Sequence, residues 1–269
     1  MTGGIKILTS NQFDHNNVRL HYMKSQESGP PVVLLHGLSD SWRTYLSFIP
    51  FISSCYTVYV PDLRGHGKSY RAESYTILDY TYDIELFLTE LFSEPVSLIG
   101  HSLGAAISLV IAARRPEKCR SISLIEPFIF KDRLDDKKSR KYFKGCLEVC
   151  TKYSDIDSIS KNIKETGTLA RKRASDFLKL DKKTIKTVLD RTIFNGFNLG
   201  ELLSKIVCPV LVLRGNPKLD AFITEEKADY LKRMISNCVI EYLEKSSHVV
   251  HVDQPFKAVQ YLLDFLASV

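Results

Sequence analysis

The feature that most constrains the fold of this chain is a glycine-flanked turn between two apolar runs. The turn, Gly100–Gly104, reads Gly-His-Ser-Leu-Gly; residues 96–99 before it resemble a buried strand, and residues 105–113 after it resemble an apolar helix. A serine in so sharp a strand-to-helix turn adopts a strained backbone that exposes its hydroxyl, and only glycine fits two positions to either side. The pattern predicts that Ser102 is a nucleophile at the end of a buried strand.

Strand-like and helix-like segments alternate along most of the chain. Asn16 and Asn17 predict the turn of a hairpin within residues 13–22. Strands are expected near 32–35, 56–60, 96–99, 122–125, 210–213 and 239–243, and helices near 41–51, 76–92, 103–115, 224–235 and 254–267. This alternation is typical of an α/β protein with a mostly parallel sheet that is covered by helices on both faces.

Several residues that follow predicted strands carry groups suited to acyl transfer. Leu38 and Leu103 are expected to offer backbone N–H groups to a developing oxyanion, the second at the amino end of a helix. Asp220 follows the strand near 210–213, and His248 follows the strand near 239–243. Because parallel strands end at one edge of a sheet, we expect these residues and Ser102 to converge there, as nucleophile, acid and base in the chain order Ser, Asp, His.

Five stretches bracket nearly the whole chain and leave only residues 131–205 unmatched: His36–Trp42, Pro61–Ser69, Gly100–Gly104, Leu213–Gly215 and His248–Pro255. Together they resemble the motifs of the α/β-hydrolase superfamily, and within it the capped single-domain esterases and C–C bond hydrolases. The resemblance implies an eight-stranded, mostly parallel sheet flanked by helices, with an inserted helical cap. Two departures are Ser247, where the family usually has glycine, and a longer loop before Asp220.

The resemblance leaves the acid and the base open. Glu126 is an alternative to Asp220 as the acid, because it ends the strand after the elbow helix, where some members of the superfamily carry theirs. His251 competes with His248 as the base. The spacing to Pro255 favours His248 and assigns His251 to the pocket or its surroundings.

Other residues of the matched stretches have structural or pocket roles. His36, His66 and His101 lie in family turns, which they are expected to brace as neutral hydrogen-bonding groups. His36 and His101 are also candidates for the pocket. Asp62 and Arg64 are expected to fix the loop after their strand, whereas Trp42, the only tryptophan, either packs beneath the cap or forms a wall of the pocket.

Residues 131–205 have helical periodicity and no strand long enough to join the sheet, so they are expected to form the cap. The core domain would then comprise residues 1–130 and 206–269. The cap contains 19 Lys and Arg residues against 11 Asp and Glu residues, whereas the rest of the chain contains 18 against 20. This surplus is interpreted as a solvated, lysine-rich surface; the alternative is attraction of an anionic substrate, an acidic carrier protein or an anionic membrane surface.

The motifs together predict a serine hydrolase that cleaves a carboxylic ester or thioester of a small organic substrate through an acyl-enzyme. Lactonase and C–C bond hydrolase are alternatives with the same triad. A non-catalytic small-molecule receptor on the same scaffold is another, since fold alone does not decide function. A serine at the elbow argues against the haloalkane dehalogenases and epoxide hydrolases of the superfamily, which use aspartate there.

Composition and the remaining motifs exclude other classes. A chain of 269 residues that is 44% hydrophobic and 25% charged can bury one large core. Without a phosphate-binding glycine loop, a metal-ligand cluster or a nucleic-acid motif, we expect no cofactor, no metal and no nucleic-acid partner. Six scattered cysteines predict reduced thiols, and Cys146 and Cys150 alone are too few ligands for a metal site. Residues 1–6 lack a leader pattern and no apolar run is long enough to span a bilayer, so a cytoplasmic location is expected.

Overall fold

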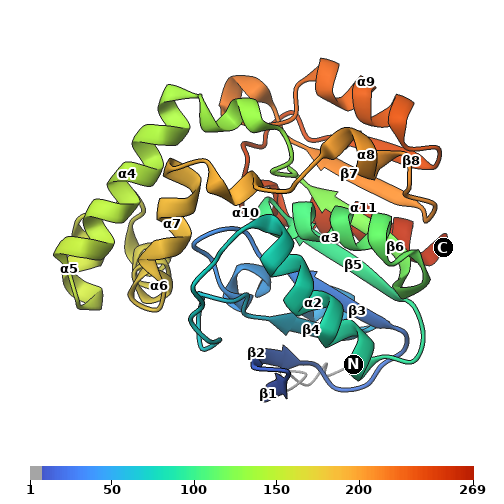
Figure 1. Cartoon of the computed structure of the whole chain (residues 1–269), viewed down its shortest axis with the longest axis horizontal. Helices are drawn as coiled ribbons and strands as arrows, with labels where there is room; N and C mark the ends of the chain where they lie inside the picture. Colours follow the sequence, from blue (N-terminus) through green and yellow to red (C-terminus); the bar gives the residue numbers. More distant parts are fainter. Residues whose placement is uncertain (1–7) are drawn as a thin grey trace.

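The computed structural model describes residues 8–269 (Figure 1). Its described part contains an eight-stranded sheet with the order β1-β2-β4-β3-β5-β6-β7-β8. The strands are Thr9–His15 (β1), Val18–Lys24 (β2), Pro31–Leu35 (β3), Thr57–Pro61 (β4), Val96–His101 (β5), Cys119–Ile125 (β6), Val210–Arg214 (β7) and Cys238–Tyr242 (β8). The predicted α/β class is confirmed. The segment 1–6, on which the expectation of no leader rests, lies outside the described residues.

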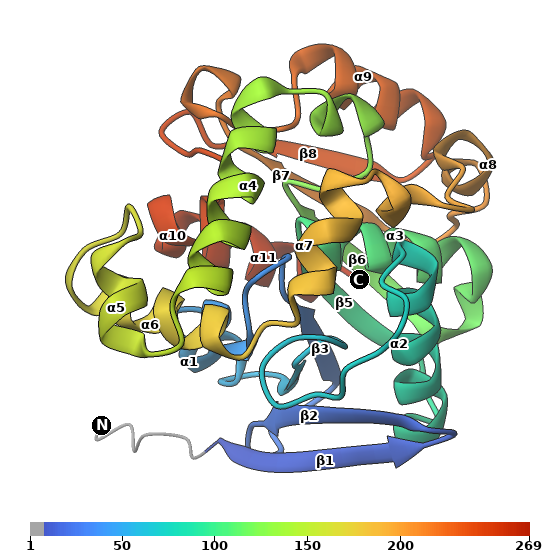
Figure 2. The same cartoon turned by 60° about the vertical axis from the view of Figure 1, so that its left-hand side comes forward.

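The predicted hairpin forms one edge of the sheet, at the opposite end from β8 (Figure 2). Strands β1 and β2 pair antiparallel around Asn16 and Asn17, whose φ angles are 48° and 64°. Two successive positive φ angles are the requirement of the tight hairpin turn that asparagine tolerates. Strand β2 then pairs antiparallel with β4, and every later pairing in the described sheet is parallel.

Helices cover both faces of the sheet, as the alternation predicts. The helices Ile77–Leu91 (α2), Leu103–Arg114 (α3) and Glu225–Met234 (α9) pack on one face, and Ile49–Ile52 (α1) and Pro255–Ala267 (α11) on the other. Figure 1 shows α2 and α3 in front of the sheet. The central strands are buried on both sides: in β3, Val33 and Leu35 face the first layer, and Val32 and Leu34 face the second.

One predicted helix is interrupted. Instead of a helix over 41–51, the structure has a short 3₁₀ helix, Trp42–Tyr45 (η1), followed by the four-residue α1. Pro50 has no N–H to donate to the carbonyl four residues earlier, so a continuous helix across this position would lose a hydrogen bond and meet a steric clash. Further short elements are Pro116–Lys118 (η2), Pro217–Leu219 (η5) and Val250–Asp253 (α10).

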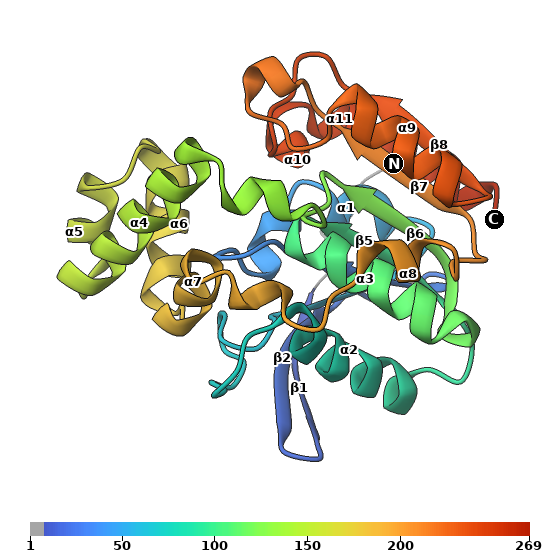
Figure 3. The same cartoon turned by 45° about the horizontal axis from the view of Figure 1, so that its top comes forward.

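The chain between β6 and β7 is a helical insertion that projects to one side of the sheet (Figure 3). It contains Lys131–Leu134 (η3), Lys137–Lys152 (α4), Ile156–Lys161 (α5), Gly167–Leu178 (α6), Lys182–Leu189 (α7), Thr192–Phe194 (η4) and Leu199–Leu203 (α8). The predicted helical insertion is therefore confirmed. Helices α4–α7 enclose a small apolar cluster of their own that includes Cys146 and Cys150, whereas α8 packs against α3 of the core.

Across the described residues, none of the helices combines the length and the apolar character needed to cross a membrane.

Candidate active site

The turn Gly100–Gly104 has the strained geometry that its sequence predicts. Ser102 has φ 51° and ψ −108°, a conformation that non-glycine residues rarely adopt, and it is the residue immediately before α3. A Cβ on Gly100 would clash with the backbone of Gly104, and a Cβ on Gly104 would clash with the carbonyl of Leu35. Both glycines are therefore required by close backbone approach. The Ser102 side chain lies at the carboxyl end of β5 and is largely buried, with 8% exposure.

Strand register brings Ser102 beside an acidic residue. In the parallel pair β5–β6, His101 is opposite Ile125, so the next residues, Ser102 and Glu126, leave the sheet side by side. Glu126 also has a positive φ, 47°. Two adjacent residues of the sheet edge thus hold strained backbones, which are retained only where surrounding contacts fix them.

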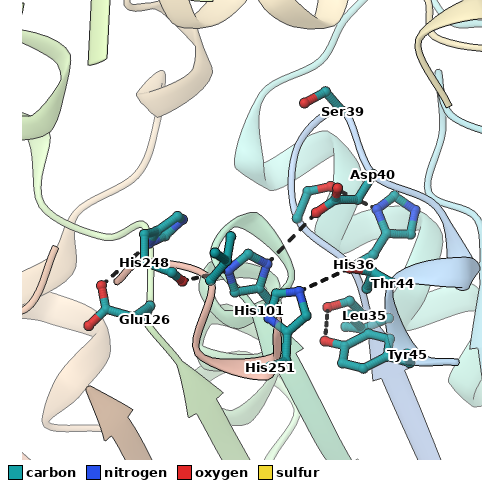
Figure 4. Close-up of polar contacts among 12 residues, drawn as sticks. Leu35, His36, Ser39, Asp40, Thr44, Tyr45, His101, Glu126, His248 and His251 are labelled. Carbon is teal, nitrogen blue, oxygen red and sulfur yellow. Dashed lines mark hydrogen bonds and ion pairs between the residues drawn. The ribbon is translucent and has the colours of Figure 1, made fainter. Parts of the chain in front are cut away.

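Glu126 contacts His248, as Figure 4 shows. Its carboxylate is fully buried and accepts hydrogen bonds from the backbone N–H groups of Gly215, at 2.8 Å, and Phe222. His248 Nδ1 lies 3.3 Å from Glu126 Oε2. Since a carboxylate can only accept, Nδ1 carries the proton and Nε2 is left as the acceptor. A buried carboxylate with three donors is well compensated for its loss of water.

Asp220 lies away from His248, so the expectation that these two side chains converge is wrong. Its side chain is 63% exposed and accepts a hydrogen bond from Lys138 Nζ at 2.8 Å. The loop after β7 forms η5, and Asp220 ends it in the left-handed region with φ 70°. Because the backbone N–H groups on either side of this loop bind Glu126, the loop turns Asp220 outward.

The ring of His248 is held between two other aromatic rings. Phe222 stacks on it with ring centroids 3.6 Å apart and an interplanar angle of 17°. The ring of His101 lies 4.9 Å away, and His101 Nε2 donates a hydrogen bond to the backbone carbonyl of His248 at 3.1 Å. In the described residues the Ser102 hydroxyl makes no hydrogen bond to His248. Phe222 lies in none of the sequence motifs, so no local pattern indicates its role.

Two neutral histidines brace the loop that follows β3. His36 Nε2 accepts the Leu63 N–H at 3.0 Å while Nδ1 donates to the Gly37 carbonyl at 2.8 Å. His66 Nε2 accepts the Ser39 N–H at 3.1 Å, and burial lowers the pKa of His66 to about 3. Both rings act as acceptors for backbone N–H groups, which requires the neutral form. The predicted bracing role is confirmed for these two residues.

The two backbone groups expected to bind an oxyanion are available. Leu38 follows the braced turn, and Leu103 is the first residue of α3, where the helix N-terminus favours negative charge. Within residues 8–269, neither amide has a protein acceptor.

The remaining pocket candidates are buried or packed against the core. His101 and His251 are each 2% exposed, with ring centroids 4.3 Å apart, and His251 Nε2 lies 3.0 Å from Thr44 Oγ1. Burial lowers the pKa of both rings, that of His101 to about 3. Trp42 packs against the apolar layer formed by α1 and α11. Its backbone N–H donates to Asp62 at 3.0 Å.

Asp62 organises the loop after β4, as predicted. It accepts hydrogen bonds from His21 Nδ1 at 2.8 Å, from Trp42 N and from Lys68 N at 3.1 Å. Burial alone would raise the pKa of Asp62, but these donors outweigh it and hold the pKa at about 2. Arg64, the other predicted loop residue, forms a two-pronged pair with Asp83.

The described side chains contain no group of three or more His, Cys, Asp or Glu residues arranged to hold a metal ion.

The chain is similar to known proteins along most of its length. Residues 30–201 match the family model described as alpha/beta hydrolase fold. The monoacylglycerol lipase ABHD6 of Mus musculus is 26% identical over 260 residues, which cover 89% of this chain and 76% of that protein. The crystal structure of E-2-(acetamidomethylene)succinate hydrolase has a TM-score of 0.79 at 20% identity and covers 97% of this chain and 100% of its own. Carboxylesterase CesB (YbfK) from Bacillus subtilis has a TM-score of 0.78 at 19% identity, with coverage of 98% and 93%.

Proposed function

The chain belongs to the α/β-hydrolase fold family, and we propose that it is a serine hydrolase that cleaves a carboxylic ester through an acyl-enzyme. One observation carries this proposal: the fully buried carboxylate of Glu126, which strand register places beside the strained Ser102, contacts the ring of His248. A strained serine, a histidine and a buried acid at one sheet edge are the parts that acyl transfer requires.

In this proposal each group of the triad has one task. The Ser102 hydroxyl attacks the carbonyl carbon while its proton passes to His248 Nε2. Glu126 accepts the hydrogen bond from His248 Nδ1, keeps the ring in the correct tautomer and stabilises the imidazolium. His248 then gives the proton to the departing alcohol. A water molecule, deprotonated by the same nitrogen, attacks the acyl-enzyme and releases the carboxylic acid.

The proposed oxyanion hole consists of the backbone N–H groups of Leu38 and Leu103. It is supported by the lack of protein acceptors for either amide in the described residues. Preorganised donors of this kind stabilise the transition state because they need no reorganisation when charge develops. The loss of one such donor would cost about 2.7–4 kcal/mol of transition-state stabilisation.

The proposed substrate is an ester with an apolar acyl group. The names of the relatives support this choice, since ABHD6 is a monoacylglycerol lipase. Three phenylalanines make the surroundings of the site apolar: Phe128 packs on Phe194, with centroids 5.1 Å apart, and on Phe222, at 6.2 Å. Phe128 is also tied to the elbow, because its N–H donates to the Ser102 carbonyl at 3.1 Å.

The decisive experiment compares two carboxylate variants on p-nitrophenyl butyrate and on a monoacylglycerol. Glu126→Gln is expected to lower kcat by about 10⁴-fold, as the loss of the orienting acid does in other triads. Asp220→Asn is expected to stay within about twofold of the wild type, because exposed ion pairs contribute little. Ser102→Ala should remove the acylation burst altogether.

Three results would contradict parts of the proposal. Strong loss in Asp220→Asn with full activity in Glu126→Gln would reverse the assignment of the acid. Retained turnover in Ser102→Ala would exclude the acyl-enzyme. The wild-type protein could also react with a fluorophosphonate at Ser102 yet hydrolyse no ester, thioester or lactone. That result would favour the interpretation as a non-catalytic receptor.

A further inference from the structure

One arginine of the insertion makes several contacts with the loop between β3 and η1. Arg173, on α6, is 14% exposed in its side chain, and its guanidinium lies over the ring of Phe177, 4.6 Å from the centroid. It donates through Nη1 to the Ser39 carbonyl at 3.0 Å and to Asp40 Oδ1 at 2.6 Å. Through Nη2 it donates to Ser39 Oγ at 2.9 Å and to the Tyr142 hydroxyl.

Ser39 is a strained residue whose polar groups are all engaged. Its φ of 63° lies in the left-handed region, which a serine enters at some energetic cost. Its N–H is bound by His66, and its carbonyl and hydroxyl are both bound by Arg173. Such a conformation persists only where its surroundings over-determine it. Two of the three polar contacts that fix Ser39 therefore come from the insertion.

Asp40, which Arg173 holds, lies near the turn Gly100–Gly104. Its Oδ2 lies 3.9 Å from His101 Nδ1, next to Ser102, and close to Gly37, where a Cβ would be 3.1 Å from the carboxylate. His101 in turn donates to the backbone carbonyl of His248. Figure 4 shows Ser39, Asp40, His101 and His248 along this path. Arg173 thus holds Asp40 close to the turn that carries Ser102, although Asp40 makes no hydrogen bond to His101.

From these contacts we propose that Arg173 is a positioning residue. It holds the loop between β3 and η1, which carries the proposed oxyanion donor Leu38, in its active conformation only while α6 of the insertion packs on the core. Leu38, whose N–H is the proposed oxyanion donor, directly precedes the Ser39-Asp40 pair that Arg173 holds. If α6 moves away, Ser39 loses two of its three fixing contacts and the Leu38 N–H loses its direction. Seating of the insertion and assembly of the oxyanion hole are then one event. This inference rests on the proposed esterase function.

A second contact on α6 supports the seating. Asp176, one turn after Arg173, is buried and accepts a hydrogen bond from the Ser41 hydroxyl at 2.7 Å. Residues three apart on a helix lie on the same face. The face of α6 that carries both side chains therefore rests on consecutive residues of one loop, 39–41, and α6 holds that loop from a single side.

The test uses three variants of the full chain. Arg173→Met removes the hydrogen bonds of this side chain to Ser39 and Asp40 and is expected to lower kcat on p-nitrophenyl butyrate by about 10- to 100-fold, with KM changed less than about threefold. Arg173→Lys can pair with Asp40 but cannot also bind the Ser39 carbonyl and hydroxyl. Compared with Arg173→Met, it should therefore have a higher thermal stability but a similarly low kcat. Arg171→Met is the matched control, since Arg171 is on the same helix in an exposed pair with Asp157. It should leave both constants unchanged.

Two further measurements separate positioning from general destabilisation. Active sites titrated with a fluorophosphonate give kcat for each folded molecule, so a lower folded fraction does not imitate the effect. Asp40→Asn combined with Arg173→Met should lower kcat no further than Arg173→Met alone, because both changes break the same contact. The inference is overturned if titrated kcat in Arg173→Met stays within about twofold of the wild type, or if the two losses multiply.

Failure of the proposed function gives a different result. In that case the wild type hydrolyses no ester, while the fluorescence of Trp42, the only tryptophan and two residues after Asp40, still reports on the loop. A shifted Trp42 emission in Arg173→Met but not in Arg171→Met supports the link between α6 and the loop. Identical emission from both variants overturns it.

Discussion

The sheet core and helices α4–α7 of the insertion, which we call the cap, are stabilised in different ways. In the core, apolar side chains fill two extensive layers on either side of a buried sheet. In the cap, one small cluster of seven buried side chains lies among four helices. Apolar burial contributes about 25 cal/mol for each Å² removed from water, so the cluster inside the cap supplies far less stabilisation than the two core layers.

The cap contacts the core through apolar packing of Val188 and Phe143 on the first core layer and through polar contacts. Beyond Arg173 and Asp176, Asp181 accepts a hydrogen bond from the Tyr75 hydroxyl at 2.6 Å and its N–H donates to the Gly65 carbonyl at 2.8 Å. Because water can replace such bonds, each contributes only about 0.5–1.5 kcal/mol net. We therefore expect the cap to open while the core remains folded. Three pairs of substitutions test this difference, and each pair has one residue in the core and one in the cap.

The largest effect is expected from a pair of glycines. Gly104→Ala places a Cβ against the Leu35 carbonyl in the core, and we expect it to destabilise the fold by more than about 4 kcal/mol. Gly145, inside α4, has no atom within 4 Å of a built Cβ, so Gly145→Ala should stabilise the cap helix by about 0.5–1 kcal/mol. Denaturant titrations followed by circular dichroism measure both. A Gly104→Ala protein with the wild-type midpoint would contradict the strained-elbow geometry.

The second pair consists of two fully buried isoleucines. Ile122 lies in β6 and Ile159 lies in α5. Ile122→Ala should lower the free energy of unfolding of the whole chain by about 2–5 kcal/mol. Ile159→Ala should accelerate amide hydrogen exchange in α4–α7 and shift the global midpoint much less. If both variants shift the global midpoint equally and exchange stays uniform, cap and core unfold as one unit.

The smallest effect concerns two buried carboxylates with opposite pKa shifts. Hydrogen bonds lower the pKa of Asp62 to about 2, so its contribution of about 2 kcal/mol is present above its unfolded pKa near 3.8 and is lost as the pH falls through about 2. Burial raises the pKa of Asp176, so the destabilisation by this carboxyl grows as the pH rises from its unfolded pKa near 3.8 to the raised pKa and is complete above it.

The variants Asp62→Asn and Asp176→Asn test these signs. Asp62→Asn should be less stable than the wild type at pH 7, and the gap should narrow below the unfolded pKa of about 3.8. Asp176→Asn should be at least as stable as the wild type at pH 7, because the amide can still accept from Ser41 without a buried charge. Unfolding free energies measured from pH 2 to pH 7 decide both. A stability gap for Asp62→Asn that widens in acid would refute the first.

Much of the fold and part of the candidate site could be predicted from local sequence patterns. The continuous apolar run of β3, the paired asparagines of the hairpin and the flanking glycines of Ser102 each encode a conformation within a few residues. The place of His248 follows from the strand before it. The interruption before Pro50 was missed, although proline lacks the N–H that a continuous helix through residues 41–51 requires.

The sequence by itself determined the α/β sheet, the strained Ser102 and the neutral bracing of the loop after β3. Only the tertiary structure decided that Glu126, rather than Asp220, meets His248, and that Arg173 holds Ser39 and Asp40. The physical reason is separation along the chain. A turn or a strand is fixed by neighbours whose sterics act over a few residues, whereas these contacts join segments more than 100 residues apart. Whether the carboxylate of Glu126 or that of Asp220 lies beside His248 depends on how whole helices and strands pack.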